Sequence, residues 1–211
     1  MTVISVNTGR PRDIHVNGDV VRTSIWKSPR EGRVRVVGFN LDGDEQSDLT
    51  VHGGEYKAVY VYPSEHYAYW RTQLPGAELP WGVFGENLTT EGVLETEVCI
   101  GDRIRIGTAE FHVTQPRQPC FKLGIRFGRD DMPKRFVASG RSGFYLSIVS
   151  DGTVGPGDAI HISRRAADGM CVADIFALKM GGHATPETLR RAASLEGLTP
   201  SWREHFRSRL G

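Results

Sequence analysis

A cysteine with cations on both sides is the most chemically distinctive feature of the sequence. Cys120 follows Pro119, and both Arg117 and Lys122 lie within three residues of it. Neighbouring cations lower the pKa of a thiol and favour the thiolate, which attacks electrophiles and binds metals. The alternative is a cysteine that only fills space in the core, because cysteine is among the most buried residue types. The segment alone leaves both interpretations open.

A second candidate site contains His52, Gly53, Gly54 and Lys57. The backbone N–H groups of paired glycines can converge on an anion, and a nearby lysine adds positive charge. The spacing is not that of a phosphate-binding P-loop. A plain turn before the strand that follows is the other interpretation.

Two further polar residues can support a ligand or a proton transfer. Asn87 lies in the segment Gly85–Leu88, where it can contact a ligand or make an Asx turn. His112 is predicted on the polar face of the strand that leads to the cysteine segment. A solvated sheet face explains His112 equally well.

Short strands are the elements expected to position these residues. Residues 109–114 alternate apolar and polar side chains, which is typical of a half-buried strand. Pro116 and Pro119 then end its ladder, because proline has no N–H group to donate. Further strands are predicted at residues 2–7, 25–27, 33–39, 58–62, 100–106, 145–149 and 159–162. Many short strands divided by Gly, Pro and Asp turns predict a mostly β fold, either a barrel or a closed sandwich.

Helices are expected mainly in the last quarter of the chain. The composition changes near Arg164, which predicts a β domain over residues 1–164 and a helical segment over residues 165–211. Residues 172–180 are helix-like, and Thr185-Pro186 and Thr199-Pro200 each place a capping residue before a proline at the first helical position. A three-helix tail is therefore predicted. Earlier in the chain, residues 65–74 form an amphipathic helix whose aromatic residues are expected in the core.

Composition narrows the functional class. The chain has 211 residues and a formal net charge of +1, which gives no general attraction to nucleic acid or to anionic membranes. Its three cysteines, Cys99, Cys120 and Cys171, form no CxxC pair, zinc pattern or iron–sulfur run. No signal sequence or membrane-spanning apolar stretch is recognisable, so a reducing cytoplasm is the expected compartment.

The order of four motifs resembles the MOSC family, whose members are related to the C-terminal domain of molybdenum cofactor sulfurase. The motifs are His52-Gly53-Gly54 with Lys57 and the following strand, then Gly85–Leu88, then the Gly101-Asp102 strand, then Arg117–Cys120. The resemblance covers roughly residues 1–164, and the tail resembles the bacterial YiiM-type subfamily. It implies a barrel-like domain that binds the molybdenum–pyranopterin cofactor.

The resemblance also implies roles for individual residues. The residue that matches the family's molybdenum ligand is Cys120, and a thiolate is a ligand that suits such a metal. The cofactor phosphate would be neutralised by His52, Gly53, Gly54, Lys57 and Arg117. Further cofactor-binding candidates by analogy are Asn87, Arg141 and Ser142.

The YiiM-like resemblance implies reduction of N-hydroxylated compounds, such as hydroxylaminopurines, to amines. His52 and His112 are the candidate proton donors. The sequence has no flavin or nicotinamide fingerprint and too few cysteines for an iron–sulfur cluster. A reductase of this kind would therefore take electrons from a separate flavoprotein or ferredoxin-type reductase.

Two other functional classes stay open. Cys120 can carry a persulfide or escort the cofactor without catalytic turnover. The chain can also be a binding module whose tail docks on a partner protein. The apolar stripes of the tail are equally compatible with packing on the barrel or with formation of a homodimer.

Overall fold

Eight strands form the main sheet of the part of the chain that the computed structural model describes, residues 1–16, 18–47 and 53–211. Their order is β13-β9-β10-β11-β7-β8-β1-β4, with β7 and β8 parallel and the other neighbours antiparallel. The strands are β1 (Thr2–Thr8), β4 (Ser28–Pro29), β7 (Val59–Pro63), β8 (Leu88–Glu91), β9 (Arg103–Ile106), β10 (Ala109–Pro116), β11 (Phe144–Ser150) and β13 (Ile160–Arg164).

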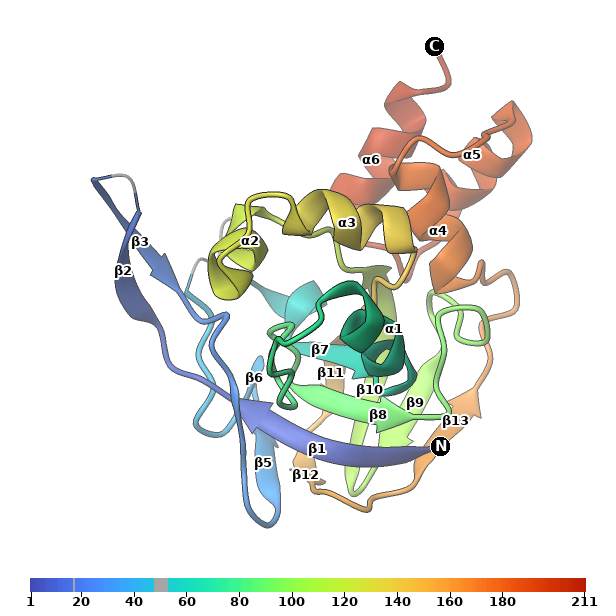
Figure 1. Cartoon of the computed structure of the whole chain (residues 1–211). Helices are drawn as coiled ribbons and strands as arrows, with labels where there is room; N and C mark the ends of the chain where they lie inside the picture. Colours follow the sequence, from blue (N-terminus) through green and yellow to red (C-terminus); the bar gives the residue numbers. More distant parts are fainter. Residues whose placement is uncertain (17, 48–52) are drawn as a thin grey trace.

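The main sheet curls into a barrel-like shape (Figure 1). The curl brings β1, the last strand but one in this order, to the residues before β13, where the N–H of Val3 donates to the carbonyl of Asp158 at 2.9 Å. Thr2 and Ala159 form an isolated antiparallel bridge there, so the described strands do not close into a continuous ladder. The prediction of a mostly β, barrel-like fold is confirmed.

Among the described residues, two smaller sheets flank the barrel. One has the order β12-β5-β6 and contains β5 (Val34–Val37), β6 (Asn40–Leu41) and β12 (Gly152–Val154). The other is a hairpin of β2 (Arg12–Val16) and β3 (Asp19–Thr23), which projects away from the barrel (Figure 1). This hairpin was not predicted from the sequence. The strand predicted at residues 25–27 is wrong, because the backbone there is irregular.

In the part of the chain that the structure describes, three helices and one short 3₁₀ turn are inserted between the barrel strands. The helices are α1 (Glu65–Gln73), α2 (Phe121–Phe127) and α3 (Met132–Ser139), and the turn is η1 (Glu55–Lys57). As predicted, Tyr67 and Trp70 of α1 are fully buried, in an aromatic cluster with Phe84 and Phe136. Burying each such side chain stabilises the fold by roughly 1.5–3 kcal/mol. Helix α2 was not predicted, and it begins directly after Cys120.

The tail contains α4 (Val172–Lys179), α5 (Pro186–Ser194) and α6 (Pro200–Ser208), and it confirms the predicted three-helix ending. The N-cap of α5 is Thr185, whose side chain accepts from the N–H of Thr188 at 3.1 Å. Ile175 and Phe206 belong to the same hydrophobic cluster as the barrel residues, so the tail packs on the barrel. Within the described ranges, no helix is long and apolar enough to cross a membrane.

Cys99 and Cys171 make a second link between the barrel and the tail. They form an antiparallel bridge, and their sulfur atoms lie 3.5 Å apart. Burial and the hydrogen bond from the neighbouring thiol raise the pKa of Cys99 to about 11. The Cys99 thiol therefore stays protonated near neutral pH, and its oxidation should be slow.

We expect a thiol oxidant such as diamide to join these two residues in a disulfide, with the two thiol hydrogens passing to the oxidant. The bond would close a loop of about 70 residues and stabilise the fold by up to about 4 kcal/mol. Non-reducing peptide mapping and the melting temperature measure both effects. Cys171→Ser should abolish the cross-link. Preferential cross-linking of Cys120 to either residue would contradict the expectation.

Candidate functional site

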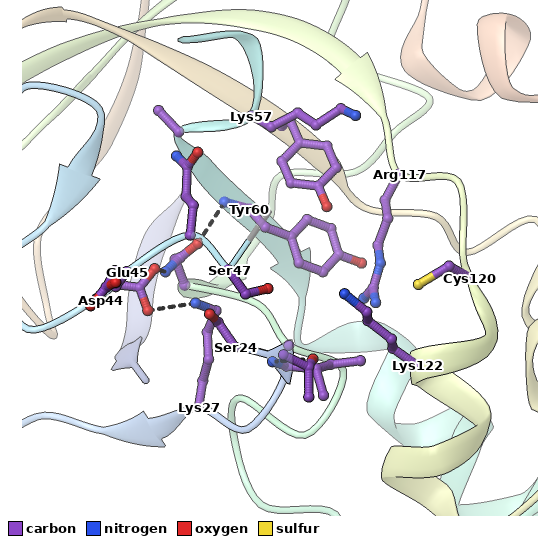
Figure 2. Close-up of a pocket in the computed structure, with 17 residues that line it drawn as sticks. Ser24, Lys27, Asp44, Glu45, Ser47, Lys57, Tyr60, Arg117, Cys120 and Lys122 are labelled. Atoms are coloured by element: carbon purple, nitrogen blue, oxygen red, sulfur yellow. Dashed lines mark hydrogen bonds and ion pairs between the residues drawn. The ribbon is translucent and has the colours of Figure 1, made fainter. Parts of the chain in front are cut away.

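A polar cavity lies beside Cys120, at the end of β10 and the start of α2. It is lined by residues from the barrel, from the end of β3 and the segment that follows it, and from the segment after β6 (Figure 2). The polar and aromatic side chains that face it include Ser24, Lys27, Asp44, Lys57, Tyr60, Asn87, Arg117, Cys120, Lys122 and Tyr145. Four of these side chains are cations, and among the described residues two carboxylates, Asp44 and Glu45, line the same space. The cavity is therefore suited to an anionic ligand.

Arg117 is the most deeply buried cation beside Cys120, with 6% of its surface exposed. Its guanidinium lies over the ring of Tyr60, 4.7 Å from the ring centre, and donates a hydrogen bond to the carbonyl oxygen of Phe84. Burial by itself lowers the pKa of Arg117, but the phenols of Tyr60 and Tyr145 and the nearby thiol outweigh it and hold the pKa above its usual value. Arg117 is therefore a permanent positive charge next to the sulfur atom.

Lys122 is buried, and it has no counter-charge among the described residues. Only 9% of its surface is exposed, and it makes no ion pair or side-chain hydrogen bond with any residue in the described ranges. Figure 2 shows Lys122, Arg117 and Cys120 turned toward the same space. Burying an unpaired charge is costly unless a ligand supplies the partner. The Ser24 hydroxyl, which lines the same cavity, also lacks a partner among the described residues.

The opposite wall of the cavity is internally neutralised. The Nζ of Lys27 donates to Asp44 at 2.5 Å, and both side chains are almost completely buried. Burial lowers the pKa of Lys27, while Asp44 opposes this shift. Asp44 also accepts from the side-chain amide of Asn87 at 2.8 Å. This wall therefore contributes little net charge to a ligand.

The loop that holds Arg117 is organised by a buried carboxylate. Glu86 accepts hydrogen bonds from the N–H groups of Gly82 and Phe84, at 2.8 and 3.1 Å, and from the hydroxyls of Tyr67 and Thr89. Burial raises the pKa of Glu86. Because these bonds fix the loop, the carbonyl of Phe84 is placed to accept from Arg117.

We expect Glu86→Ala to destabilise the fold by about 3 kcal/mol or more, because four buried donors lose their acceptor. Urea unfolding measures the change. Glu110→Ala is the matched control, since Glu110 pairs with Arg103 at the surface and should cost less than about 1 kcal/mol. Equal losses in the two variants would contradict the assignment of Glu86 as the loop's anchor.

The structure brings several of the predicted site residues together. Cys120, Arg117, Lys57 and Asn87 all line the cavity. The side chain of Asn87 is occupied, however: it accepts from the N–H of Tyr60 at 3.0 Å and donates to Asp44, so its evident role is to hold the cavity wall. Gly54 lies in the backbone before η1, with a positive φ of 91°. His52 falls outside the described residues.

The structure places three other candidates away from this cavity. Arg141 lies over the ring of Tyr69 at 3.9 Å, and the hydroxyl of Ser142 donates to the carbonyl of Gly143 at 2.8 Å. Neither residue lines the cavity, and Ser142 contributes only indirectly because its carbonyl accepts from the Tyr60 hydroxyl. His112 accepts from Arg103 at 3.2 Å and does not line it either. Their proposed roles in cofactor binding or proton transfer stay predictions, and this geometry does not favour them.

Sequence reasoning missed several cavity residues. Lys27, Asp44, Tyr60 and Tyr145 come from four separate segments. The predicted strands at residues 58–62 and 145–149 contain the two tyrosines, but nothing in the sequence indicated that their side chains face the cavity. No local signal marks Lys27 and Asp44, because their pairing is a tertiary contact.

Comparison with known proteins agrees with the fold and with the motifs. The family model described as MOSC domain matches residues 48–161, and the one described as YiiM-like, 3-alpha helix domain matches residues 172–210. The crystal structure of YiiM from Geobacillus stearothermophilus superposes with a TM-score of 0.82 and 33% identity, covering 100% of this chain and 99% of that one.

Three relatives are similar to this chain in sequence. The uncharacterized protein YflK of Bacillus subtilis is 39% identical over 97% of this chain and 92% of its own length. The protein YiiM of Escherichia coli is 34% identical over 89% of this chain and 84% of its own. A protein of Gibberella moniliformis named reductase is 32% identical over 77% of this chain, which corresponds to 29% of its own length. The chain belongs to the MOSC domain family and carries the YiiM-like three-helix domain at its C-terminus.

Proposed function

We propose that this protein is a molybdenum-cofactor-dependent oxidoreductase that reduces N-hydroxylated compounds to amines. Its membership of the MOSC family and its similarity to a protein named reductase support an oxidoreductase-like role. The strongest support for the proposal is that Cys120 lines a cavity in which the buried Lys122 has no counter-charge among the described residues.

The protein ligands available at this site fit a metal ion that is already coordinated mainly by a cofactor. The described residues contain no group of three or more His, Cys, Asp or Glu side chains able to hold a metal ion. Cys120 offers one soft sulfur ligand, which suits a metal already held by the sulfur donors of a cofactor. The cations around it suit the phosphate that the pyranopterin carries.

Each cavity residue has a defined task in this proposal. Lys122, Arg117 and Lys57 would neutralise the phosphate, and Cys120 would ligate the metal. The rings of Tyr60 and Tyr145, which also line the cavity, would lie beside the cofactor. Burial raises the pKa of Tyr145, so its hydroxyl keeps its proton at neutral pH and can donate a hydrogen bond beside Cys120.

The cofactor would supply two-electron redox chemistry at its metal. In the net reaction, an N-hydroxyl compound takes up two electrons and two protons and gives the amine and one water molecule. The electrons would come from a separate reductase protein, of the flavoprotein or ferredoxin type. His52 stays the predicted proton donor, whereas His112 is held by Arg103 away from the cavity.

The test is to purify the protein from molybdate-fed cells and to measure molybdenum and pterin per chain. We expect values near one for each, and turnover of a hydroxylaminopurine with an artificial electron donor. Absence of both metal and pterin, also after reconstitution, would overturn the proposal. Stoichiometric cofactor with no turnover would instead indicate a cofactor carrier.

A further inference from the structure

A second cavity, of about 220 Å³, lies against Cys120 between the barrel and the tail. Lys57, Cys120 and Tyr145 line both this cavity and the polar one. The thiol therefore stands at the border between two spaces. The first contains the cluster of cations, and the second has Lys57 as the one charged side chain among its described lining residues.

The second cavity is lined by a residue with a buried amide oxygen that has no hydrogen-bond partner among the described residues. Only 2% of Gln115 is exposed, and its Oε1 makes no hydrogen bond with the described residues. Its Nε2 makes a single long contact, at 3.5 Å, with the carbonyl of the adjacent Pro116. In either orientation of the amide, one of its two polar atoms has no good hydrogen-bond partner among the described residues that line the cavity. A buried polar atom of this kind is expected to meet a ligand or water.

The tail supplies the aromatic wall of this cavity. Trp202, in the first turn of α6, lines it together with Gln118 and Pro119 of the cysteine loop. Trp202 is 95% buried at the interface of tail and barrel, so its ring is held in place by packing. An indole ring packs well against a planar molecule, and the side-chain amides beside it can hydrogen-bond to the edge of such a molecule. This lining therefore suits a planar, uncharged ring system with N–H groups.

We propose that this second cavity is the substrate chamber, that it receives a planar nitrogen heterocycle, and that Gln115 and Trp202 determine its specificity. The inference rests on the proposed function. The division of charge supports it, because the anionic cofactor would occupy the cationic cavity and leave the nearly neutral one for the substrate.

This assignment gives the helical tail a role in substrate binding. Gln115 hydrogen-bonds one edge of the heterocycle, Trp202 lies against its face, and the N–O group points to Cys120. Gln115 and Trp202 are specificity residues rather than catalytic ones, because neither is assigned to the reacting bond. The cofactor cavity contains no described residue of the tail, so changes at Trp202 should leave cofactor content unchanged.

The test uses Gln115→Met, which removes the amide and keeps nearly the same shape, with the exposed Gln73→Met as control. The full-length, cofactor-loaded protein is assayed with 6-hydroxylaminopurine for kcat and KM. Binding of adenine, which has no N–O bond to reduce, is measured by calorimetry. We expect the KM and the adenine Kd of Gln115→Met to rise about tenfold, with kcat and molybdenum content within about threefold of wild type. Trp202→Leu should weaken adenine binding in the same direction.

The outcomes separate the two proposals. Unchanged KM and unchanged adenine Kd in both Gln115→Met and Trp202→Leu, in a protein that turns over, would overturn the chamber and leave the reductase proposal intact. Absence of cofactor and turnover in wild type would overturn the reductase proposal. Adenine binding can still be measured in that case, and binding that depends on Gln115 would support the chamber independently of catalysis. No adenine binding to such a protein would overturn the chamber as well.

Discussion

Cys120→Ser is expected to keep the fold and to lose molybdenum. Serine replaces the soft thiolate by a hard hydroxyl of similar size, so the ligand changes while the packing before α2 is preserved. Loss of outer-shell partners alone typically costs 10–100-fold in metal affinity, so loss of a direct ligand should cost at least about 100-fold. Elemental analysis after gel filtration measures the metal, and turnover should fall in parallel.

The other two cysteines provide the control for this variant. Cys99 and Cys171 contact each other, and neither lines the cofactor cavity. Cys99→Ser should therefore keep molybdenum content and turnover within about twofold of wild type. Full molybdenum content and activity in Cys120→Ser, with an unchanged melting curve, would disprove the assignment of Cys120 as the metal ligand.

Lys122→Met is expected to weaken cofactor binding and to stabilise the cofactor-free protein. Lys122 is buried without a counter-charge among the described residues, so its ammonium costs free energy in the empty site. Methionine removes that cost and keeps the length of the side chain. We expect a rise in the unfolding free energy of about 1 kcal/mol and a loss of cofactor affinity of about tenfold or more, since charge-assisted bonds to a phosphate contribute roughly 1.5–3 kcal/mol.

The opposite signs of the two effects make this variant informative. Thermal unfolding of the cofactor-free protein and pterin content after reconstitution measure them separately. Lys134→Met, at an exposed position of α3, is the control and should change neither quantity appreciably. A melting temperature that falls in Lys122→Met, with cofactor content unchanged, would identify Lys122 as a structural residue instead of an anion ligand.

The strands and helices that have a local sequence pattern could be predicted from the sequence. Alternation predicted most strands of the barrel, and the Thr-Pro pairs predicted the starts of α5 and α6. Helix α2 was missed because Gly124 in its middle and the two prolines before it suppress a helix prediction. The hairpin of β2 and β3 was missed among Gly, Pro and Arg residues, although Asn17-Gly18 is a typical hairpin turn signal.

The candidate site could be predicted only in part. Cys120, Arg117 and Lys57 were recognisable from residue type and spacing, and the structure brings them to one cavity. Arg141 and Ser142 were chosen by analogy, and their side chains bond locally outside it. Motif membership therefore did not distinguish the residues that face the ligand space from those that support the neighbouring backbone.

Periodicity, helix caps and short motifs are local features, and they were enough to predict the family, the barrel with its three-helix tail and the cysteine between cations. The three-dimensional packing was needed to show that Lys122 lacks a described counter-charge and that Lys27 is neutralised by Asp44. It alone placed Trp202 beside Cys120. The physical reason is that burial and charge pairing depend on residues distant in the chain, whose approach is set by the packing of strands and tail.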